Sequence, residues 1–360
     1  MNYVKLEDIC NITTGKYDAN HGENGGDYHF YTCAIEPIKC PTFSFEGECI
    51  ILPGNGANVG EVLYHNGKFE AYQRTYVLQN LHANPRFVYY QLKSRWKKYI
   101  SNKQYGSATN YIRYNNIAEF QIPMLSLEEQ KKIAQILDKA DEIRTKKRLA
   151  NAKLDEFLKS TFIDMFGDPV TNEKNWNTDI LNNVAPIKSY SGEVEKIDGK
   201  FWLLNLDVVE SNTGKILEYN YEASIPNSTC CFNSDMVLYS KLRPYLNKVV
   251  LPNKTGYATS ELVPLNPVKE KLNKYFLASL LRSKCFVDDI NVRVAGAKMP
   301  RVSMDYLRNF PIILPPIEDQ NKFAQIVEKV EEQKQKNEQV IEQMDNLFNS
   351  LSQRAFKGEL

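Results

Sequence analysis

Several loops of the sequence gather arginine, lysine and asparagine beside glycine or aromatic residues. The longest of them, residues 240–248, reads Ser-Lys-Leu-Arg-Pro-Tyr-Leu-Asn-Lys and joins two strand-like runs. Arginine and asparagine can each form two hydrogen bonds to the edge of a guanine or an adenine in the DNA major groove, and lysine binds phosphate. These loops therefore predict recognition of nucleic acid. The candidate DNA-contacting residues are Asn55, Asn58, Arg74, Tyr111, Arg113, Lys241, Arg243, Tyr245, Lys248, Lys298 and Arg301.

The alternative reading of such loops is that their charges are merely solvated. A further basic cluster between Lys93 and Lys98 falls on the back of a helix predicted over residues 85–100, where a solvated face is the better interpretation. The formal net charge of +1 gives the chain no overall basic field. A local patch or a partner subunit would then have to supply the attraction to DNA.

No catalytic motif accompanies the loops. The sequence has no Gly-x-x-x-x-Gly-Lys-Ser/Thr phosphate loop, no Gly-x-Ser-x-Gly elbow and no Gly-x-Gly-x-x-Gly after a strand. The string at 266–269, Asn-Pro-Val-Lys, departs from the Asn-Pro-Pro-Tyr motif of amino-methyltransferases. Two Glu-x-Lys strings, at 129–131 and 332–334, fall in predicted helices, where surface charge explains them. We therefore expect a chain without catalytic residues.

Metal binding and membrane insertion are not expected either. His21, His29, Cys33 and Cys40 match no compact zinc spacing, and the second half of the chain has no counterpart to them. The seven cysteines include no Cys-x-x-Cys pair, the first residues do not resemble a signal peptide, and no apolar run approaches membrane length. These features predict a cytoplasmic protein with free thiols.

A long internal repeat organises the chain. Residues 120–166 recur as residues 310–356 without a gap, and fourteen of the 47 aligned pairs are identical. The chain is therefore two copies of one unit, each with about 150 residues of mixed sequence before a long helix. Because a duplicated protein presents two similar surfaces, we expect it to bind something bipartite.

The repeated segment has apolar residues at alternating spacings of three and four, which is typical of a coiled coil. Lys147 and Asn337 interrupt the two seams at the same point, and a polar residue there fixes register. If the helices pair antiparallel, these two residues should face each other; the alternative is a solvated break. The residues expected to pair the helices are Ile136, Ile143, Lys147, Leu154, Ile326, Asn337 and Met344.

The predicted fold class is α+β, with two pseudo-symmetric α/β domains separated by two long helices that pair as an antiparallel coiled coil. Prolines and acidic residues mark the start of each long helix, as at Pro315-Pro316. Gly106 to Phe120 aligns with Gly296 to Phe310 at the same offset as the helices, which places the loops of the two domains alike. The predicted segments are residues 1–122, 123–166, 167–312 and 313–360.

At this point the sequence resembles the specificity subunits of type I restriction-modification systems. The resemblance rests on two strings before the helices, Ile-Pro-Met-Leu-Ser-Leu-Glu-Glu-Gln at 122–130 and Ile-Leu-Pro-Pro-Ile-Glu-Asp-Gln at 313–320, and on the tail Arg-Ala-Phe-Lys-Gly-Glu-Leu at 354–360. It covers essentially the whole chain. The departure is Ser126-Leu127, where the family usually has a second proline.

The resemblance implies that each target recognition domain reads one half of an interrupted double-stranded DNA sequence. The helices would be the spacer and would dock two methyltransferase subunits, through Glu128, Gln130, Glu318 and Gln320. S-adenosylmethionine would belong to that partner, and ATP and Mg²⁺ to restriction motor-nuclease subunits, so this chain itself would hold no cofactor. The alternatives are a self-sufficient methyltransferase or nuclease of related architecture, and a non-catalytic coiled-coil scaffold.

Overall fold

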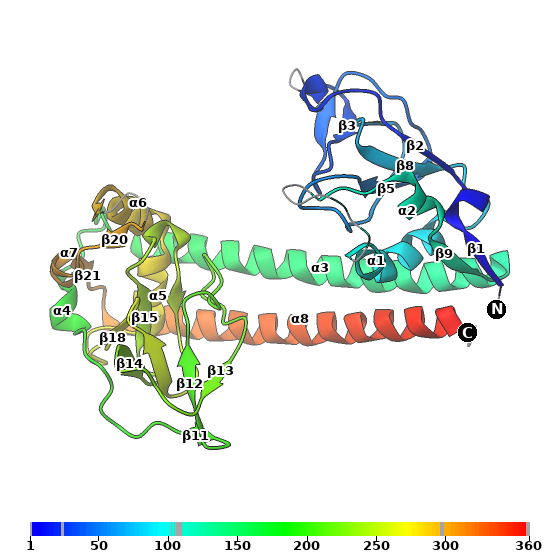
Figure 1. Ribbon diagram of the computed structural model, residues 1–360. Coiled ribbons are helices and arrows are strands. Elements are labelled where there is room, and N and C mark those ends of the chain that lie inside the picture. The colour runs from blue at the N-terminus through cyan, green and yellow to red at the C-terminus, as the bar shows by residue number, and fades with distance from the viewer. Residues whose placement is uncertain are drawn as a thin grey trace. The chain divides into compact units, whose positions relative to one another are not determined.

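The computed structural model describes residues 2–22, 25–101, 103, 105, 110–295 and 299–357. The chain divides into two compact units, and each contains a part of both long helices (Figure 1). Unit 1 consists of residues 1–148 and 338–360, and unit 2 of residues 149–337. The predicted α+β class is confirmed, because each unit combines mixed sheets with helices. The predicted boundary at 166 coincides with the end of a long helix, whereas those at 122 and 312 fall inside the strands Gln121–Met124 and Pro311–Ile313. The compact units instead divide both long helices, so the predicted segment bounds stay a prediction.

Unit 1 is built on an antiparallel sheet with the strand order β2-β8-β5-β6. Strand β5 is buried from Cys49 to Pro53, as its run of mostly apolar residues requires. A second sheet has the order β4-β3-β7, with β3 and β7 parallel. The strands are β2 Asn11–Thr14, β3 Tyr28–Tyr31, β4 Ile38–Cys40, β5 Glu48–Pro53, β6 Leu63–Asn66, β7 Phe69–Ala71 and β8 Thr75–Gln79.

Unit 2 repeats this plan. Leu238 pairs with Val250 as Ile51 pairs with Leu63, each 187 residues earlier. Its second sheet is larger, with the order β11-β12-β17-β14 and β13 beside β12, and again contains one parallel pair, β12 with β17. The strands are β11 Lys196–Ile197, β12 Lys200–Leu204, β13 Asn220–Glu222, β14 Thr229–Phe232, β15 Val237–Ser240, β16 Val249–Val250, β17 Gly256–Thr259, β18 Leu262–Leu265, β19 Val294–Ala295 and β20 Arg301–Val302.

Short elements attach the long helices to the sheets in the same way in both units. β1 (Asn2–Lys5) pairs with β9 (Gln121–Met124), and β10 (Thr178–Ile180) pairs with β21 (Pro311–Ile313). The amide of Leu6 donates to the carbonyl of Phe120 at 3.0 Å, and that of Leu181 to Phe310 at 2.8 Å. The short helices are η1 Leu6–Asp8, η2 Ala19–Gly22, α2 Tyr114–Ala118, α4 Leu181–Val184, η3 Pro244–Leu246 and α7 Met304–Asn309.

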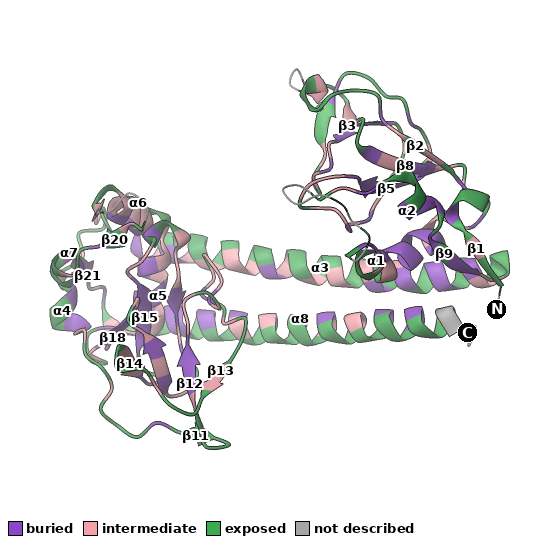
Figure 2. Ribbon diagram, viewed as in Figure 1, coloured by how far each residue is buried: buried purple, intermediate pink, exposed green. Residues whose placement is uncertain are grey.

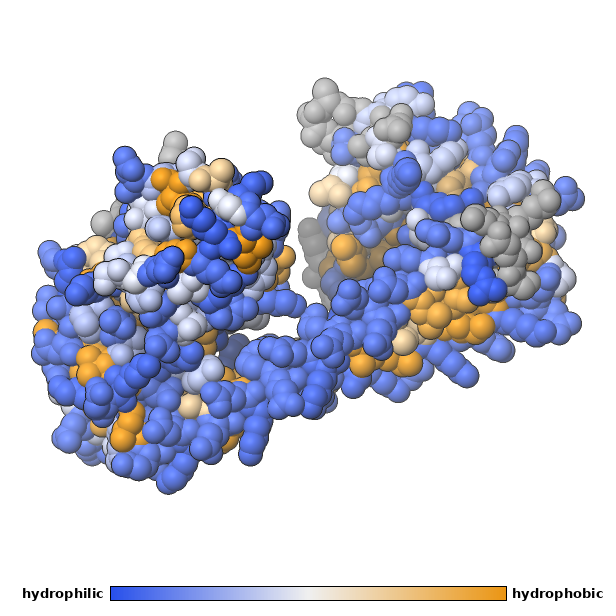
Figure 3. Space-filling model, turned by 90° about the horizontal axis from the view of Figure 1, so that it is seen from below, coloured by the Kyte–Doolittle hydropathy of each residue, from blue (hydrophilic) through white to orange (hydrophobic). Residues whose placement is uncertain are grey.

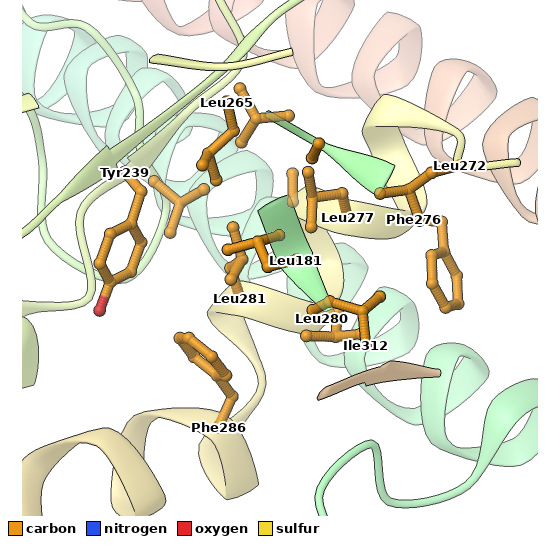
Figure 4. Packing of buried hydrophobic residues seen from close by; sticks show 14 of the residues in the cluster. Leu181, Tyr239, Leu265, Leu272, Phe276, Leu277, Leu280, Leu281, Phe286 and Ile312 are labelled. Carbon is orange, nitrogen blue, oxygen red and sulfur yellow. The ribbon is translucent and has the colours of Figure 1, made fainter. Parts of the chain in front are cut away.

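Amphipathic helices cover the sheets. Helix α1 (Pro85–Ser101) matches the predicted helix and buries Phe87, Val88 and Trp96 in the core of unit 1. In unit 2 the corresponding helix is α5 (Lys274–Arg282), and α6 (Lys284–Val292) follows directly. Figure 4 shows Leu181, Leu265 and Leu277 gathered near the centre of this core, with Phe276 beside Leu272 at one side of it. Such close-packed cores hold the connecting loops in fixed positions.

The long helices are α3 (Leu127–Phe166) and α8 (Ile317–Lys357). The Ser126 hydroxyl and the Glu129 carboxylate cap the first turn of α3 reciprocally, as in a capping box. Gly167, with φ of +76°, follows its last turn, where a left-handed conformation favours glycine. Both helices alternate buried and exposed residues along their length (Figure 2). Among the described residues, every helix is too short or too polar to cross a lipid bilayer.

The buried face of α3 differs from the predicted seam. Ile136 is 44% exposed and Ile143 is 39% exposed, so their assignment to helix pairing is wrong. The buried positions lie one residue later, at Leu137 and at the half-buried Arg144. A polar residue such as Arg144 cannot be recognised by a search for apolar spacing. Of the other predicted pairing residues, Asn337 is buried, and Lys147, Leu154, Ile326 and Met344 are half-buried.

Two cross-helix ion pairs obey the repeat. In unit 1 the Arg144 guanidinium contacts the Asp345 carboxylate at 2.5 Å, and in unit 2 the Lys334 ammonium contacts the Asp155 carboxylate at 2.8 Å. Lys334 stands 190 residues after Arg144, and Asp345 stands 190 residues after Asp155, so each pair is the repeat of the other. In both units the residue three positions before the cation, Asp141 or Glu331, is a second acidic partner. Within each unit the two helices run antiparallel (Figure 1).

A buried amide pair lies within unit 2. The Asn337 side-chain amide donates to Oδ1 of Asn151 at 2.7 Å, and both residues are at most 9% exposed. The repeat of Asn151 in the second helix is Ile341, so this contact has no equivalent. Lys147 and Asn337 fall in different units, and their pairing stays a prediction.

Candidate nucleic-acid interface

Three backbone hydrogen bonds fix the candidate loops of unit 1 at the end of β5. The amide of Gly54 donates to the carbonyl of Arg74 at 3.0 Å, and the amide of Ile112 donates to the carbonyl of Gly54 at 2.9 Å. The amide of Gly56 donates to the carbonyl of Asn110 at 2.8 Å. Three segments that are far apart in the sequence are thereby joined into one hydrogen-bonded frame. We call these three bonds and the segments they join the loop frame of unit 1.

Unit 2 contains the same loop frame. The amide of Lys241 donates to the carbonyl of Glu261 at 3.0 Å, and that of Val302 to the carbonyl of Lys241 at 2.9 Å. The amide of Arg243 donates to the carbonyl of Pro300 at 2.8 Å. The loop residues stand 187 positions after those of unit 1, and the residues before the long helix stand 190 positions after theirs. The two units therefore hold different side chains on one shared backbone arrangement.

The frame explains an unusual backbone conformation. Arg243 has φ of +49°, in the left-handed region that non-glycine residues rarely adopt. Its equivalent in unit 1 is Gly56, which has φ of +85° and can adopt such values without steric cost. Unit 2 therefore places an exposed arginine at a position whose backbone geometry favours glycine.

In unit 1 the frame brings together three of the predicted residues. Asn55, Arg74 and Tyr111 line one small open pocket of about 210 Å³, together with Thr14 and Gln73. Asn55 and Tyr111 are neighbours in an antiparallel bridge. Side chains that can accept or donate hydrogen bonds therefore surround a surface hollow, and such groups can pair with base edges.

Two further predicted residues of unit 1 lie differently. The Arg113 guanidinium stands 4.6 Å from the ring centroid of Tyr105, which stacks on Tyr111 at 5.5 Å between ring centroids. Arg113 and Tyr105 are exposed, and Tyr111 is half-buried and belongs to both the stack and the pocket lining. Asn58, in contrast, donates its side-chain amide to the carbonyl of Cys33 at 2.9 Å, so its donors are at least partly used within the unit.

In unit 2 the loops over 240–248 and 299–302 meet, as expected if they form one surface. Leu242 and Arg301 are bridge partners, and Arg243 and Tyr245 are exposed. The Arg301 guanidinium contacts the Glu261 carboxylate at 2.9 Å, and this hydrogen bond raises the pKa of Arg301. Three of the predicted residues therefore share one surface, while Lys241 contributes its backbone to the frame and is itself half-buried.

The prediction for Lys248 loses its basis. Its ammonium donates to the carbonyl of Leu206 at 2.8 Å, and burial lowers the pKa of Lys248. Because this group already binds a backbone carbonyl within the unit, we do not retain it in the interface. Lys298 lies outside the described residues.

Sequence reasoning missed several residues of these surfaces. Gln73 and Thr14 line the pocket of unit 1, Tyr105 stacks beside it, and Glu261 binds Arg301. The signal that could have found Glu261 is the offset of 187 between the loops, because it aligns Glu261 with the predicted Arg74. The alignment of the strand pairs thus identifies contact positions that side-chain type alone does not.

Gln130 and Gln320 are not docking residues. Gln130 is 2% exposed and Gln320 is fully buried, so neither can touch a partner. Gln130 accepts from the amide of Asn84 at 2.8 Å, and Gln320 accepts from the amide of Asn273 at 2.9 Å. Each therefore ties the first turn of a long helix to the start of α1 or α5. Glu128 and Glu318 are exposed in the same turns, and their docking role stays a prediction.

Replacing Gln320 with leucine should destabilise the protein. The amide of Gln320 also donates to the carbonyls of Lys271 at 3.1 Å and Pro315 at 2.8 Å, so the change leaves three backbone groups without this partner. We expect a loss of about 2–4 kcal/mol in the free energy of unfolding, measured by urea denaturation. Gln325→Leu, at an exposed position of the same helix, is the control and should change it by less than about 0.5 kcal/mol. Equal effects of the two changes would contradict the stabilising role of the Gln320 hydrogen bonds.

The sequence candidates for a metal site have other contacts. His21 is hydrogen bonded to the Thr42 hydroxyl at 2.8 Å, and the Cys40 thiol donates to the Thr42 carbonyl at 3.1 Å. Within the described residues, no three His, Cys, Asp or Glu side chains are grouped to hold a metal ion. All seven cysteines are described and free, and burial raises the pKa of Cys10 to about 12 and that of Cys49 to about 11. These two thiols therefore stay protonated at neutral pH.

Comparison with known proteins identifies the family. The profile of the type I restriction modification DNA specificity domain matches the chain twice, over residues 1–156 and 153–344. The chain belongs to this family. Each match of the specificity domain contains one of the two loop frames, and the second match begins within α3. The duplicated sequence is thus a duplicated specificity domain.

Individual relatives of this specificity chain agree with the family. It is 27% identical to the type I restriction enzyme EcoDI specificity subunit of Escherichia coli, over 99% of this chain and 88% of the relative. It is 25% identical to the MjaIX specificity subunit of Methanocaldococcus jannaschii, over 76% of this chain and 68% of the relative. A crystal structure of a type I restriction-modification S subunit from M. genitalium has the same fold, with a TM-score of 0.67, 16% identity and coverage of 99% and 96%.

Proposed function

We propose that the chain is the sequence-specific DNA-recognition subunit of a type I restriction-modification complex. The observation that carries the proposal is the loop frame, which occurs once in each unit with different side chains around it. One scaffold with two sets of polar side chains suits a DNA sequence made of two different halves. Each unit would read one half, and the DNA segment between the halves would go unread.

The exposed side chains suit contacts to base edges. Arg74 and Asn55 in unit 1 can bind guanine and adenine respectively, and Arg243 and Arg301 in unit 2 can each bind guanine or phosphate. Tyr111 and Tyr245 offer rings beside them. Because the chain has a net charge of only +1, these contacts position and select, and a partner must supply much of the attraction to the DNA backbone.

The partner is an adenine methyltransferase, present in two copies, that docks on the helices. Ile136 and Ile143 stand seven residues apart on one face of α3 and are exposed, so both side chains are accessible to a partner that docks on this helix. In the space-filling view, hydrophilic residues cover most of the visible surface and hydrophobic residues form separate patches (Figure 3). The acidic residues Glu128 and Glu318 would add polar contacts at the start of each helix.

The chemistry belongs to these partners. S-adenosylmethionine would bind in the methyltransferase, and a restriction motor-nuclease joining the complex would use ATP and Mg²⁺. The chain would then act in the cytoplasm as a non-catalytic subunit. This division of labour accounts for a sequence that has polar recognition loops and no catalytic motif.

Methylation by the purified complex tests the proposal. The chain with its methyltransferase and S-adenosylmethionine should methylate adenine only within a bipartite sequence, which sequencing of methylated random DNA would reveal. The doubly substituted Ile136→Asp, Ile143→Asp chain should keep its thermal stability, since both residues are exposed, and lose at least about tenfold in methyltransferase affinity.

Two controls complete this experiment. The chain alone should methylate nothing, and methylation without the partner would contradict a non-catalytic role. Lys146→Asp with Lys153→Asp changes two exposed lysines of the same helix and tests whether any added acid on α3 disrupts the complex. An undivided recognition sequence would contradict the assignment of one half-site to each unit.

A further inference from the structure

One pair of equivalent positions in the two loop frames carries opposite charges. The carbonyl of Arg74 in unit 1 and that of Glu261 in unit 2 accept the same frame hydrogen bond, at 3.0 Å in both cases. Each residue stands immediately before a strand, β8 in unit 1 and β18 in unit 2. The side chains 74 and 261 therefore leave the frame from the same backbone position, one as a cation and the other as an anion.

Glu261 is engaged with an arginine of the same surface. Its Oε1 lies 2.9 Å from Nη2 of Arg301, and its Oε2 lies 3.5 Å from Nε of the same guanidinium. The carboxylate thus faces the Nε–Nη2 edge of the fork side-on. The Glu261 side chain is 24% exposed and that of Arg301 is 50% exposed, so the pair lies at the surface rather than in the core.

This contact leaves part of the guanidinium available. A guanidinium carries five N–H donors, and a side-on carboxylate occupies the donor of Nε and one donor of Nη2. The two donors of Nη1 and the second of Nη2 remain for another ligand. Guanine offers the matching pair of acceptors, O6 and N7, in the major groove.

The backbone on both sides of this pair is also fixed. Arg301 forms an antiparallel bridge with Leu242, and the next amide, that of Val302, donates to Lys241. Glu261 accepts from the amide of the same Lys241. Both side chains of the ion pair therefore start from one hydrogen-bonded frame, which limits how far their ends can move relative to each other.

We propose that Glu261 is a positioning residue that orients the Arg301 guanidinium toward a guanine in the half-site read by unit 2. The proposal rests on the proposed function. Its ligand is the O6/N7 edge of one guanine, and its counterpart in unit 1 is absent, because the equivalents of Glu261 and Arg301 are Arg74 and Tyr111. The two half-sites should therefore differ in this contact.

The rival role for Arg301 is a contact to phosphate, and it predicts a different result. An exposed ion pair stabilises a protein little, so removing Glu261 should leave folding unchanged under either role. If Arg301 binds phosphate, removing a nearby negative charge strengthens binding to all sequences alike. If Glu261 orients Arg301 on a guanine, removing it weakens the preference for that base and leaves other positions unchanged.

The experiment compares sequence preference in the complete complex. The full chain with its methyltransferase would select from DNA randomised at each half-site position in turn, with wild type, Glu261→Gln and Arg301→Lys. We expect Glu261→Gln to lower the preference for guanine at one position of one half-site about five- to tenfold. Arg301→Lys keeps the charge, loses the fork, and should lower the same preference at least as far. The double variant should lose little more than Arg301→Lys alone.

The control is Asp305→Asn, which removes another exposed ion pair of unit 2, Asp305 with Arg308 at 3.2 Å, and should change no preference. A uniform gain in affinity with Glu261→Gln, or an unchanged preference at every position, would overturn the positioning role and leave the proposed function intact. A wild-type complex without sequence preference would overturn the proposed function itself.

Discussion

Exchange of residues 1–122 for the same segment of another family member should change one half of the methylated sequence completely and leave the other half as it was. The reason is that the loop frame of unit 1 is closed by hydrogen bonds among residues 54, 56, 74, 110 and 112, all inside the exchanged segment. Unit 2 closes its own frame from residues 241–302. Sequencing of methylated DNA from cells that carry the hybrid chain and its methyltransferase would show the outcome.

The hybrid must keep the contacts that tie the exchanged segment to the long helices. Asn84 donates its amide to Gln130, and Arg86 binds Asp138 through Nε at 2.7 Å. The unexchanged chain carrying Asn84→Pro, which removes the donor, is the control for loss of folding rather than of specificity. Changes in both halves of the sequence would show that the units do not read independently.

Lengthening both long helices by four residues should lengthen the unread spacer of the DNA site. Four residues add roughly 6 Å to a helix, and DNA base pairs rise about 3.4 Å, so the spacer should grow by about two base pairs. The insertion points are after Arg148 and after Glu338, which are equivalent in the repeat. Methylated-site sequencing should show both half-sequences retained at the new distance.

Insertion into α3 alone is the informative control. Asp155 follows Arg144 by eleven residues, and Asp345 follows Lys334 by the same number, so the ion pairs match in both helices. A single insertion makes these lengths unequal, and one ion pair or the Asn151–Asn337 bond must break. We expect lower thermal stability for that variant than for the double insertion. An active double variant with its original spacer would show that the helices do not set the distance.

The helix pairing shows where sequence reasoning stops. The repeat and the long helices were predictable because apolar spacing and identity persist over 47 aligned positions. The buried face was misplaced because α3 also carries a second apolar row, with Ile136 and Ile143, that stays exposed. The true face includes Arg144 and Asn151, and only a partner across the helix pair makes such polar residues suitable there.

The loops of the candidate interface were predictable, but the contacts that their side chains make within the protein were not. Arginine and asparagine loops indicated the surface, and the structure joins the 240–248 loop to Arg301 through the backbone. Lys248 has the same composition signal as Arg243, yet the path of the chain turns its ammonium toward Leu206. Gln130 and Gln320 are identical in both repeats because they perform the same internal task, and identity alone does not distinguish that task from docking.

The Asn151–Asn337 bond has a consequence for how a duplicated chain avoids mixing with other molecules. Because each long helix descends from one ancestor, α3 could in principle pair with α3 of a second chain. In that arrangement Asn151 would face the repeat of Asn337, which is Lys147, and in the α8 pair Asn337 would face the repeat of Asn151, which is Ile341. Only unlike helices bring the two amides together in the buried seam. This hydrogen bond therefore favours the pairing of α3 with α8 over the pairing of either helix with its own copy in a second chain.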